Sequence, residues 1–315
     1  MENIGEEFVS GFVSIVGRPN VGKSTLMNRF LGEKLAIMTP KPQTTRNQIR
    51  GILNQERAQI VFVDTPGVPE KFGGKKGAFL EFLGEEALKD LEDVDLVLFV
   101  LDGQVGLTAF DLQLWQKIMS DPLQQEKTLV LVNKVDQIKP KEKILLLMKE
   151  ISEKMAAQDI FPCSAKSGLG VEEIMEKIRT YLPWGPPLYP LDQLSDQNDR
   201  FWVSEIIREK LFLSMHQEIP YSIAVQVQEF QERERVIQME AHIFVERISQ
   251  KGMVIGKNAR VLKKVGSLAR AELEKLFGKK IFLNLQVKVL KNWSRNENYL
   301  KELGYGISSV EERSL

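Results

Sequence analysis

The sequence predicts an α/β domain with a mostly parallel sheet and helices on both faces, followed by a smaller α+β domain. From Phe8 to Leu182 short apolar strands alternate with amphipathic helical stretches, which is the order typical of such a sheet. After the Pro-rich stretch Pro183–Pro190 the pattern changes to alternating apolar and polar residues, which favours half-exposed antiparallel strands. A length of 315 residues also suggests two cores.

The elements follow in order along the chain. In the first domain we predict strands at 12–16, 59–63, 96–101, 128–132 and 159–162, and helices at 23–31, 81–91 and 142–155. In the second domain we predict strands at 222–230, 236–245 and 281–290, and a helix at 259–277. Four prolines between Pro183 and Pro190 exclude a helix interior and a central strand, so this stretch is predicted to be a stiff linker. We predict a first domain at 8–183, a linker at 184–200, a second domain at 201–306 and a tail at 307–315.

The composition excludes several classes of protein. Basic and acidic residues number 43 each, so net charge predicts no polyanionic partner, but the segment Arg247–Lys291 holds twelve Lys or Arg and only two Glu. That local surplus is typical of nucleic-acid binding and also of a solvated helix face. The single cysteine, Cys163, excludes a disulfide framework and a cysteine-based zinc site, and is expected to be a small buried apolar residue. No secretory signal and no apolar run of membrane-spanning length are found, so we expect a cytoplasmic protein.

A phosphate-binding loop is predicted between the first strand and the first helix. Residues Gly17, Arg18, Pro19, Asn20, Val21, Gly22, Lys23 and Ser24 match G-x-x-x-x-G-K-[ST], and Thr25 continues into the helix. Glycines let backbone N–H groups turn toward a phosphate, and the helix N-terminus adds a favourable dipole. Lys23 is expected at the β- and γ-phosphates, and Ser24 at Mg²⁺.

The segment Asp64-Thr65-Pro66-Gly67 closes the strand 59–63. A carboxylate at that strand end is placed to hold Mg²⁺ through its water shell, and the N–H of Gly67 is expected near the γ-phosphate. By itself this sequence also fits a plain turn; its position after a phosphate-binding loop makes it a functional candidate.

Asn133-Lys134-Val135-Asp136 predicts recognition of guanine. Guanine presents N1–H and an amine side by side, two donors that the Asp136 carboxylate accepts together, whereas adenine presents an acceptor at N1. A mismatch costs roughly 1–3 kcal/mol for each group left unpaired. Ser164-Ala165-Lys166 follows a later strand, where a backbone N–H could contact guanine O6. All four motifs stand at the carboxyl ends of predicted strands, where α/β sheets bind ligands.

With these motifs the chain resembles the translation-factor-related GTPases, and among them the Era-type GTPases with a C-terminal KH domain. The resemblance covers nearly the whole chain. It rests on GRPNVGKS (17–24), QTTR (43–46), DTPG (64–67), NKVD (133–136), CSAK (163–166), DRFWVSEIIREK (199–210), IPYS (219–222), VIGK (254–257) and NWSRNENYLKELGY (292–305).

The resemblance implies a GTP-hydrolysing switch. It places Thr44 and Thr45 in the first switch, where one of them closes on Mg²⁺, and we assign this role to Thr45. Without the resemblance, the two threonines would be read as the start of a strand at 47–53. The catalytic candidates are Lys23, Thr44, Thr45 and Gly67. Val68 stands where Ras-like proteins carry a water-orienting Gln, so slow intrinsic hydrolysis is expected. Asn20 matches an asparagine that helps to hold K⁺ in potassium-activated relatives, so K⁺ is a candidate cofactor.

The second domain resembles a KH domain of the α-β-β-α-α-β type, whose G-x-x-G loop clamps a single-stranded RNA backbone. The expected RNA contacts are Gly256, Lys257, Asn258, Arg260, Lys263 and Lys264. The fourth loop position is Ala259 instead of Gly: alanine is harmless if the residue is helical, and the loop must differ if φ is positive. The alternative is a basic helix on a small sheet without an RNA role.

The resemblance further implies single-stranded 16S rRNA as the target, a role in assembly of the 30S subunit, and association with the inner face of the cell membrane. We expect a monomer. Two rival functions are a P-loop kinase or other transferase, which has no use for NKVD, and a non-catalytic RNA-binding scaffold that merely holds nucleotide. The ratio of GTP to ATP affinity separates the first from a GTPase, and single-turnover hydrolysis separates the second.

Overall fold

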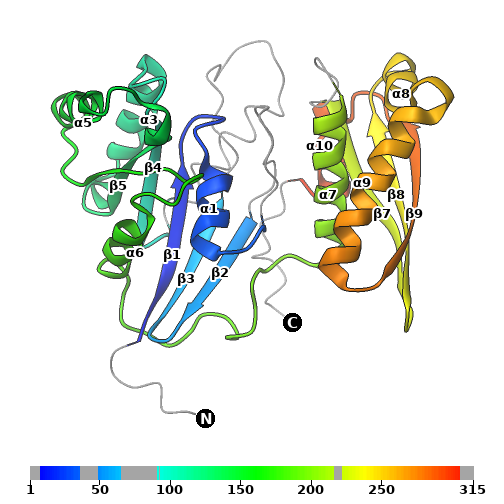
Figure 1. The fold of residues 1–315 in the computed structure, drawn as a ribbon, viewed down its shortest axis with the longest axis horizontal. Coiled ribbons are helices and arrows are strands. Elements are labelled where there is room, and N and C mark those ends of the chain that lie inside the picture. Colours follow the sequence, from blue (N-terminus) through cyan, green and yellow to red (C-terminus); the bar gives the residue numbers. More distant parts are fainter. Residues whose placement is uncertain (1–7, 36–48, 65–90, 92, 216–221, 306–315) are drawn as a thin grey trace. The chain divides into compact units, whose positions relative to one another are not determined.

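A computed structural model describes residues 8–35, 49–64, 91, 93–215 and 222–305. The chain divides into two compact units, with the boundary between Asp196 and Gln197. Figure 1 shows the fold in the colours of the sequence. Both predicted fold classes are confirmed, and each unit is described by itself.

The first unit contains a six-stranded sheet in the order β2-β3-β1-β4-β5-β6 (Figure 1). Its strands are β1 (Val9–Val16), β2 (Ile49–Gln55), β3 (Ala58–Asp64), β4 (Leu96–Asp102), β5 (Thr128–Asn133) and β6 (Ile160–Pro162). All neighbouring pairs are parallel except β2 with β3. The central strand β4 is buried at every position, because helices cover both faces of a parallel sheet.

The helices in the described part of this unit form two layers. They are α1 (Lys23–Leu31), α3 (Ala109–Met119), α4 (Pro122–Gln125), α5 (Glu142–Met155) and α6 (Val171–Arg179). On one face α3 and α5 pack over β4 and β5, where the rings of Phe99 and Trp115 meet edge to face at 5.3 Å. On the other face the ring of Phe30 from α1 stacks on Phe62 of β3 at 5.0 Å. The two layers hold the strand ends in fixed register.

The Pro-rich segment is packed along the first unit as far as Asp196. Gln59 of β3 is fully buried, and its amide bonds the backbone of Leu188 and Tyr189. The N–H of Ile52 in the edge strand β2 donates to the carbonyl of Leu194 at 2.9 Å. This pairing covers the exposed edge of the sheet, which would otherwise be free to pair with another chain. Our placement of a linker at 184–200 stays a prediction.

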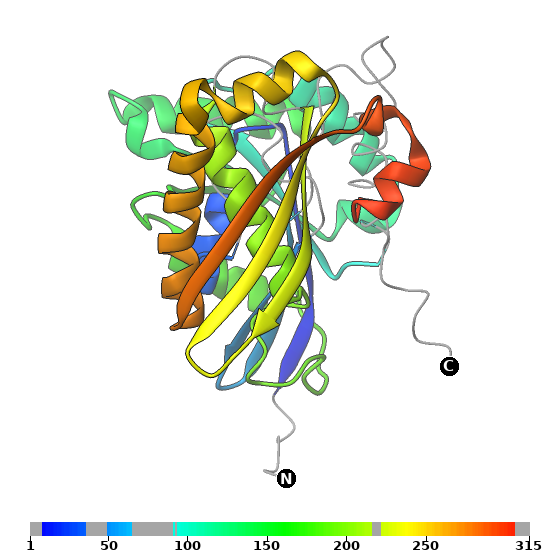
Figure 2. The same ribbon diagram turned by 90° about the vertical axis from the view of Figure 1, so that its right-hand side faces the viewer.

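The second unit is a three-stranded sheet with helices on one face. In chain order its elements are α7 (Asp199–Ser214), β7 (Ile223–Glu232), β8 (Val236–Val245), α8 (Ile248–Ile255), α9 (Arg260–Phe277), β9 (Lys280–Val289) and α10 (Glu297–Glu302). β7 pairs antiparallel with β8, as predicted, and β8 pairs parallel with β9. Figure 2 shows the sheet in front of α7 and α9.

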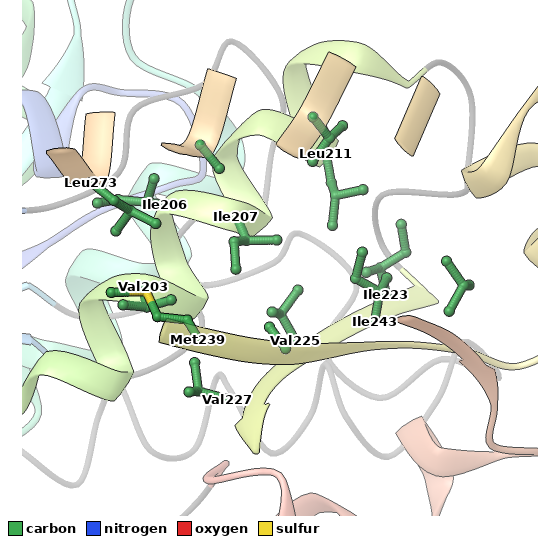
Figure 3. Close-up of a cluster of buried hydrophobic side chains, with 14 of the residues drawn as sticks. Val203, Ile206, Ile207, Leu211, Ile223, Val225, Val227, Met239, Ile243 and Leu273 are labelled. Atoms are coloured by element: carbon green, nitrogen blue, oxygen red, sulfur yellow. The ribbon is translucent and has the colours of Figure 1, made fainter. Parts of the chain in front are cut away.

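The core of the second unit lies between the sheet and α7 and α9. Alternate strand residues such as Val225, Met239 and Ile243 point toward Val203, Ile207 and other apolar residues of α7 (Figure 3). The period of two in the strands explains why the alternation was readable in the sequence. Trp293 is fully buried, and its ring stacks on that of Tyr305, so it is a core residue. Among the described residues no helix is long and apolar enough to cross a membrane.

Candidate functional site

The loop Gly17–Ser24 connects β1 to α1 in a conformation that its glycines permit. Gly22 has φ +104°, and a Cβ there would lie 2.3 Å from Nδ2 of Asn133. Gly17 also approaches the backbone of β4 closely, since a Cβ would lie 2.5 Å from the carbonyl of Val100. Only glycine fits both positions, for steric as well as conformational reasons. The predicted loop therefore has the tight backbone that brings N–H groups toward a phosphate.

Lys23 and Ser24 begin α1 and face the end of β3. Lys23 is 6% exposed, and its ammonium donates to the carbonyls of Gly17 and Arg18, each at 3.2 Å. Burial lowers the pKa of Lys23 from 10.5 to about 8, against an opposing effect of the Asp64 charge. The hydroxyl of Ser24 donates to Oδ2 of Asp64 at 2.6 Å. A hydroxyl and a carboxylate in contact form the oxygen donor set that Mg²⁺ prefers.

The residues after β5 connect the loop to the neighbouring strand ends. Nδ2 of Asn133 donates to the carbonyl of Val21 at 2.8 Å, and its Oδ1 accepts from the N–H of Ala165 at 3.0 Å. Lys134 donates to the carbonyl of Asn20 and to the carboxylate of Asp102, both at 2.6 Å. Asp136, in a short 3-10 turn, stays exposed. The structure thus brings together the predicted phosphate loop, Asp64, the NKVD segment and the 164–166 loop.

Several predicted residues lie outside the described part of the chain. They are Thr44, Thr45, Thr65, Pro66, Gly67 and Val68. Pro19 and Thr25 are half-buried beside the loop and Val21 is buried. Ser164 is fully buried, and Lys166 is exposed. Cys163 is also fully buried, which raises the pKa of its thiol to about 12 and makes it unreactive, as expected for an apolar core residue.

Sequence reasoning missed three residues that hold the site in place. Asp111 is fully buried, and its carboxylate accepts from Nε of Arg18 at 2.7 Å while it also caps α3 through Thr108. Asp102 receives Lys134. Arg29 of α1 bonds the 164–166 loop. A carboxylate at the end of the predicted strand 96–101 was a readable signal for Asp102; nothing local to the sequence pointed to Asp111 or Arg29.

In the second unit the predicted G-x-x-G loop joins α8 to α9. Gly256 has φ +72°, and a Cβ there would lie 2.6 Å from Cγ2 of Val261. Asn258 and Ala259 both have positive φ, 54° and 58°. Ala259 thus has the positive φ for which we expected the loop to differ from a G-x-x-G loop, and α9 begins after it, at Arg260. The exposed loop residues and the first turn of α9 carry the predicted cations Lys257, Arg260, Lys263 and Lys264.

We expect Ala259→Gly to stabilise the second unit slightly. The left-handed conformation destabilises the folded state by roughly 1–2 kcal/mol when the residue is alanine. Glycine removes this cost, but it also increases the conformational entropy of the unfolded chain, which offsets about 0.4–1 kcal/mol of the gain. The net gain is up to about 1 kcal/mol in the free energy of unfolding, measured by urea denaturation. Gly256→Ala is the matched opposite change, and it should destabilise because of its contact with Val261. A loss of stability in Ala259→Gly would contradict the assigned backbone.

The two units together define a class of protein: a P-loop GTPase domain joined to a KH domain. A family model described as "50S ribosome-binding GTPase" matches residues 12–134, and a KH domain model matches residues 218–294. The chain is 45% identical over 312 residues to the GTPase Era of Geobacter metallireducens, covering 95% of this chain and 98% of that protein. It is 42% identical to that of Caldanaerobacter subterraneus, covering 95% and 98%. The chain belongs to the Era family of GTPases.

Two solved structures are similar over the same extent. One is an Era variant from Aquifex aeolicus bound to GDP.AlF4-, with a TM-score of 0.90, 36% identity and coverage of 95% of this chain and 100% of that chain. The other is Era in complex with MgGDPNP and nucleotides 1506–1542 of 16S ribosomal RNA, with a TM-score of 0.90, 37% identity and the same coverage. Hydrolysis of GTP is therefore the activity of this chain, and the predicted GTPase fold is confirmed.

We expect the affinity for GTP to fall as pH rises above about 8. The free protein loses the Lys23 proton near pH 8, whereas phosphates beside Lys23 would raise its pKa in the complex. Binding then takes up a proton, so affinity is flat below pH 8 and falls by up to about tenfold per pH unit above it. Isothermal titration between pH 7 and 9 measures this. Lys23→Arg is the control because guanidinium does not titrate in this range; an equal slope in both proteins would contradict the assignment to Lys23.

Proposed function

We propose that this GTPase binds guanine nucleotide at the strand ends described above and, when loaded with GTP, binds single-stranded 16S rRNA through its KH domain to assist 30S assembly. The observation that supports the nucleotide site is a set of three hydrogen bonds: Asn133 and Lys134 donate to carbonyls of the phosphate loop, and the N–H of Ala165 donates to Asn133. These bonds connect the loop proposed for the phosphates to the segments proposed for the base, which supports a single pocket. The pocket comprises residues 17–25, 64–67, 133, 134, 136 and 164–166.

Each group of the pocket has a chemical role in this proposal. Lys23 holds the β- and γ-phosphates, and the loop N–H groups surround the β-phosphate. Ser24 and Asp64 are the residues that would hold Mg²⁺, which supplies charge neutralisation at the phosphates when bound. Asp136 accepts N1–H and the amine of guanine. Thr44, Thr45 and Gly67 are proposed to close on the γ-phosphate, on the strength of the family resemblance.

The RNA role rests on the KH domain and on the charge of its loop. Lys257, Arg260, Lys263 and Lys264 are exposed around a loop whose backbone is held by Gly256 and Asn258. Exposed cations beside a constrained loop suit the backbone phosphates of a single strand. The solved Era complex with a 16S rRNA fragment names the class of RNA that a relative binds. The proposed contacts are residues 256, 257, 258, 260, 263 and 264.

Binding of a fluorescent 16S rRNA 3′-end oligonucleotide tests the RNA role. We expect tighter binding with a non-hydrolysable GTP analogue than with GDP. The double variant Lys263→Ala with Lys264→Ala should bind more weakly and lower the salt slope by about 0.7 for each phosphate that it no longer neutralises. Lys275→Ala, an exposed cation near the other end of α9, is the matched control. In cells, crosslinking that recovers messenger RNA without rRNA would overturn the ribosomal target.

Potassium is the proposed activating cation. Asn20 lies exposed in the phosphate loop with φ 67°, and its carbonyl is held by Lys134. A monovalent cation beside the phosphates would add positive charge where negative charge develops. GTP turnover should be faster in KCl than in NaCl, and Asn20→Ala should remove the difference. Equal turnover of the unmodified protein in the two salts rejects this role. From the resemblance to Era we also propose that the protein is a monomer, that it is cytoplasmic, and that it associates peripherally with the membrane.

A further inference from the structure

Arg29 connects the helix that carries Lys23 to the loop at the opposite end of the pocket. It lies on α1, and its guanidinium reaches two successive carbonyls after β6. Nε donates to the carbonyl of Ala165 at 2.9 Å, and Nη2 donates to the carbonyl of Lys166 at 2.7 Å. The planar fork of a guanidinium suits two neighbouring acceptors, whereas an ammonium is a single point charge. The contact is therefore specific to arginine.

The loop organises its other polar groups internally or toward Asn133. The carbonyl of Ser164 accepts from the N–H of Gly168 at 2.8 Å, and its hydroxyl accepts from the N–H of Ser167 at 3.1 Å. The N–H of Ala165 donates to Asn133. Arg29 donates to the next two carbonyls along the chain, those of Ala165 and Lys166. Because a trans peptide is planar, a carbonyl directed toward α1 turns the N–H of the same unit away from it. Binding of the Ala165 carbonyl thus sets the direction of the Lys166 N–H.

We infer that Arg29 is a positioning residue for guanine recognition, which acts by orienting the 164–166 loop so that a backbone N–H meets O6. This inference rests on the proposed pocket, in which Asp136 takes the other edge of the base. Lys23 and Arg29 stand on one helix, separated by about 9 Å of helical rise. The same rigid element therefore sets the position of the phosphates and, through Arg29, of the O6 contact.

Matched ligands separate this role from general stabilisation. 6-thio-GDP keeps N1–H and the amine of guanine but replaces O6 with sulfur, a weaker acceptor, whereas IDP keeps O6 and lacks the amine. We expect Arg29→Ala to lower GDP affinity by about three- to tenfold, as for the loss of one ordinary hydrogen bond. The preference for GDP over 6-thio-GDP should shrink by a similar factor, and the preference for GDP over IDP should stay unchanged. The GDP affinity of Arg29→Lys and its preference for GDP over 6-thio-GDP should lie between those of the unmodified protein and Arg29→Ala.

The variant is expected to fold, because Arg29 is exposed and alanine favours a helix. Arg179→Ala, which removes an exposed arginine from α6 bonded to Gln55, is the control for loss of charge and should leave both preferences unchanged. Equal losses for GDP and 6-thio-GDP in Arg29→Ala, with a normal preference over IDP, overturn this inference alone. An unmodified protein that binds IDP as tightly as GDP overturns the proposed base pocket, and the inference with it.

Discussion

The Asp136→Asn variant is expected to lose affinity for GDP by about a hundredfold and to gain affinity for XDP. A carboxylate accepts the two adjacent donors of guanine, N1–H and the amine. An asparagine amide offers one acceptor and one donor, which matches xanthine, where N1–H stands beside a carbonyl oxygen. Asp136 is exposed in a short turn, so the substitution leaves the packing of the first unit unchanged. The reversal therefore isolates base recognition.

Competition of unlabelled GDP and XDP against a fluorescent nucleotide measures this reversal. Asp192→Asn, an exposed carboxylate in the segment that follows the first unit's last helix, is the matched control and should keep the preference for GDP. A variant that retains GDP and does not gain XDP would mean that Asp136 does not meet the base.

Lys23→Ala is expected to lower single-turnover GTP hydrolysis by about a hundredfold or more, since removing one preorganised charge from developing negative charge costs that much in other enzymes. Its ammonium is almost fully buried at the start of α1, where it bonds two loop carbonyls. Alanine removes the cation that we propose for the β- and γ-phosphates. It also leaves the two carbonyls without that donor, so GTP affinity should fall as well.

Measurement at saturating protein separates the chemical step from binding. Lys154→Ala removes an exposed cation of α5 that is paired with Glu150, and it should hydrolyse GTP at the unmodified rate. Single-turnover rates that are equal in Lys23→Ala and the unmodified protein would contradict the role of Lys23. If Lys154→Ala keeps the unmodified rate and Lys23→Ala loses it, the loss follows from the position of Lys23 and not from the removal of a positive charge in general.

Much of the fold could be predicted because its signals are local and periodic. The helix at Lys23–Leu31 and the strand at Val236–Val245 have the predicted ends, since apolar spacing and the adjacent turn residues set both. No bounds were predicted for α3, α4, α6, α7, α8 or α10; the α-β-β-α-α-β order of a KH domain implied α7 and α8 without bounds. All of these except α7 have 11 residues or fewer, and short elements carry few repeats of the pattern. α7 has 16 residues, but Glu205–Phe212 are buried at every position, so no single apolar face marks it as a helix. Ala259 shows the limit at a single residue: alanine permits two backbone conformations, and packing of the loop selected the less common one.

The amino-acid sequence by itself determined the chemistry of this protein: the phosphate loop, the strand-end motifs, the KH-type loop and the order of the two units are contiguous patterns that can be read without coordinates. Only the tertiary structure decided what holds those motifs in register. Arg18 meets Asp111, and Arg29 meets the 164–166 loop, across separations of 93 and about 137 residues. Such contacts depend on how layers of helices pack against the sheet, and no spacing within a short window records them.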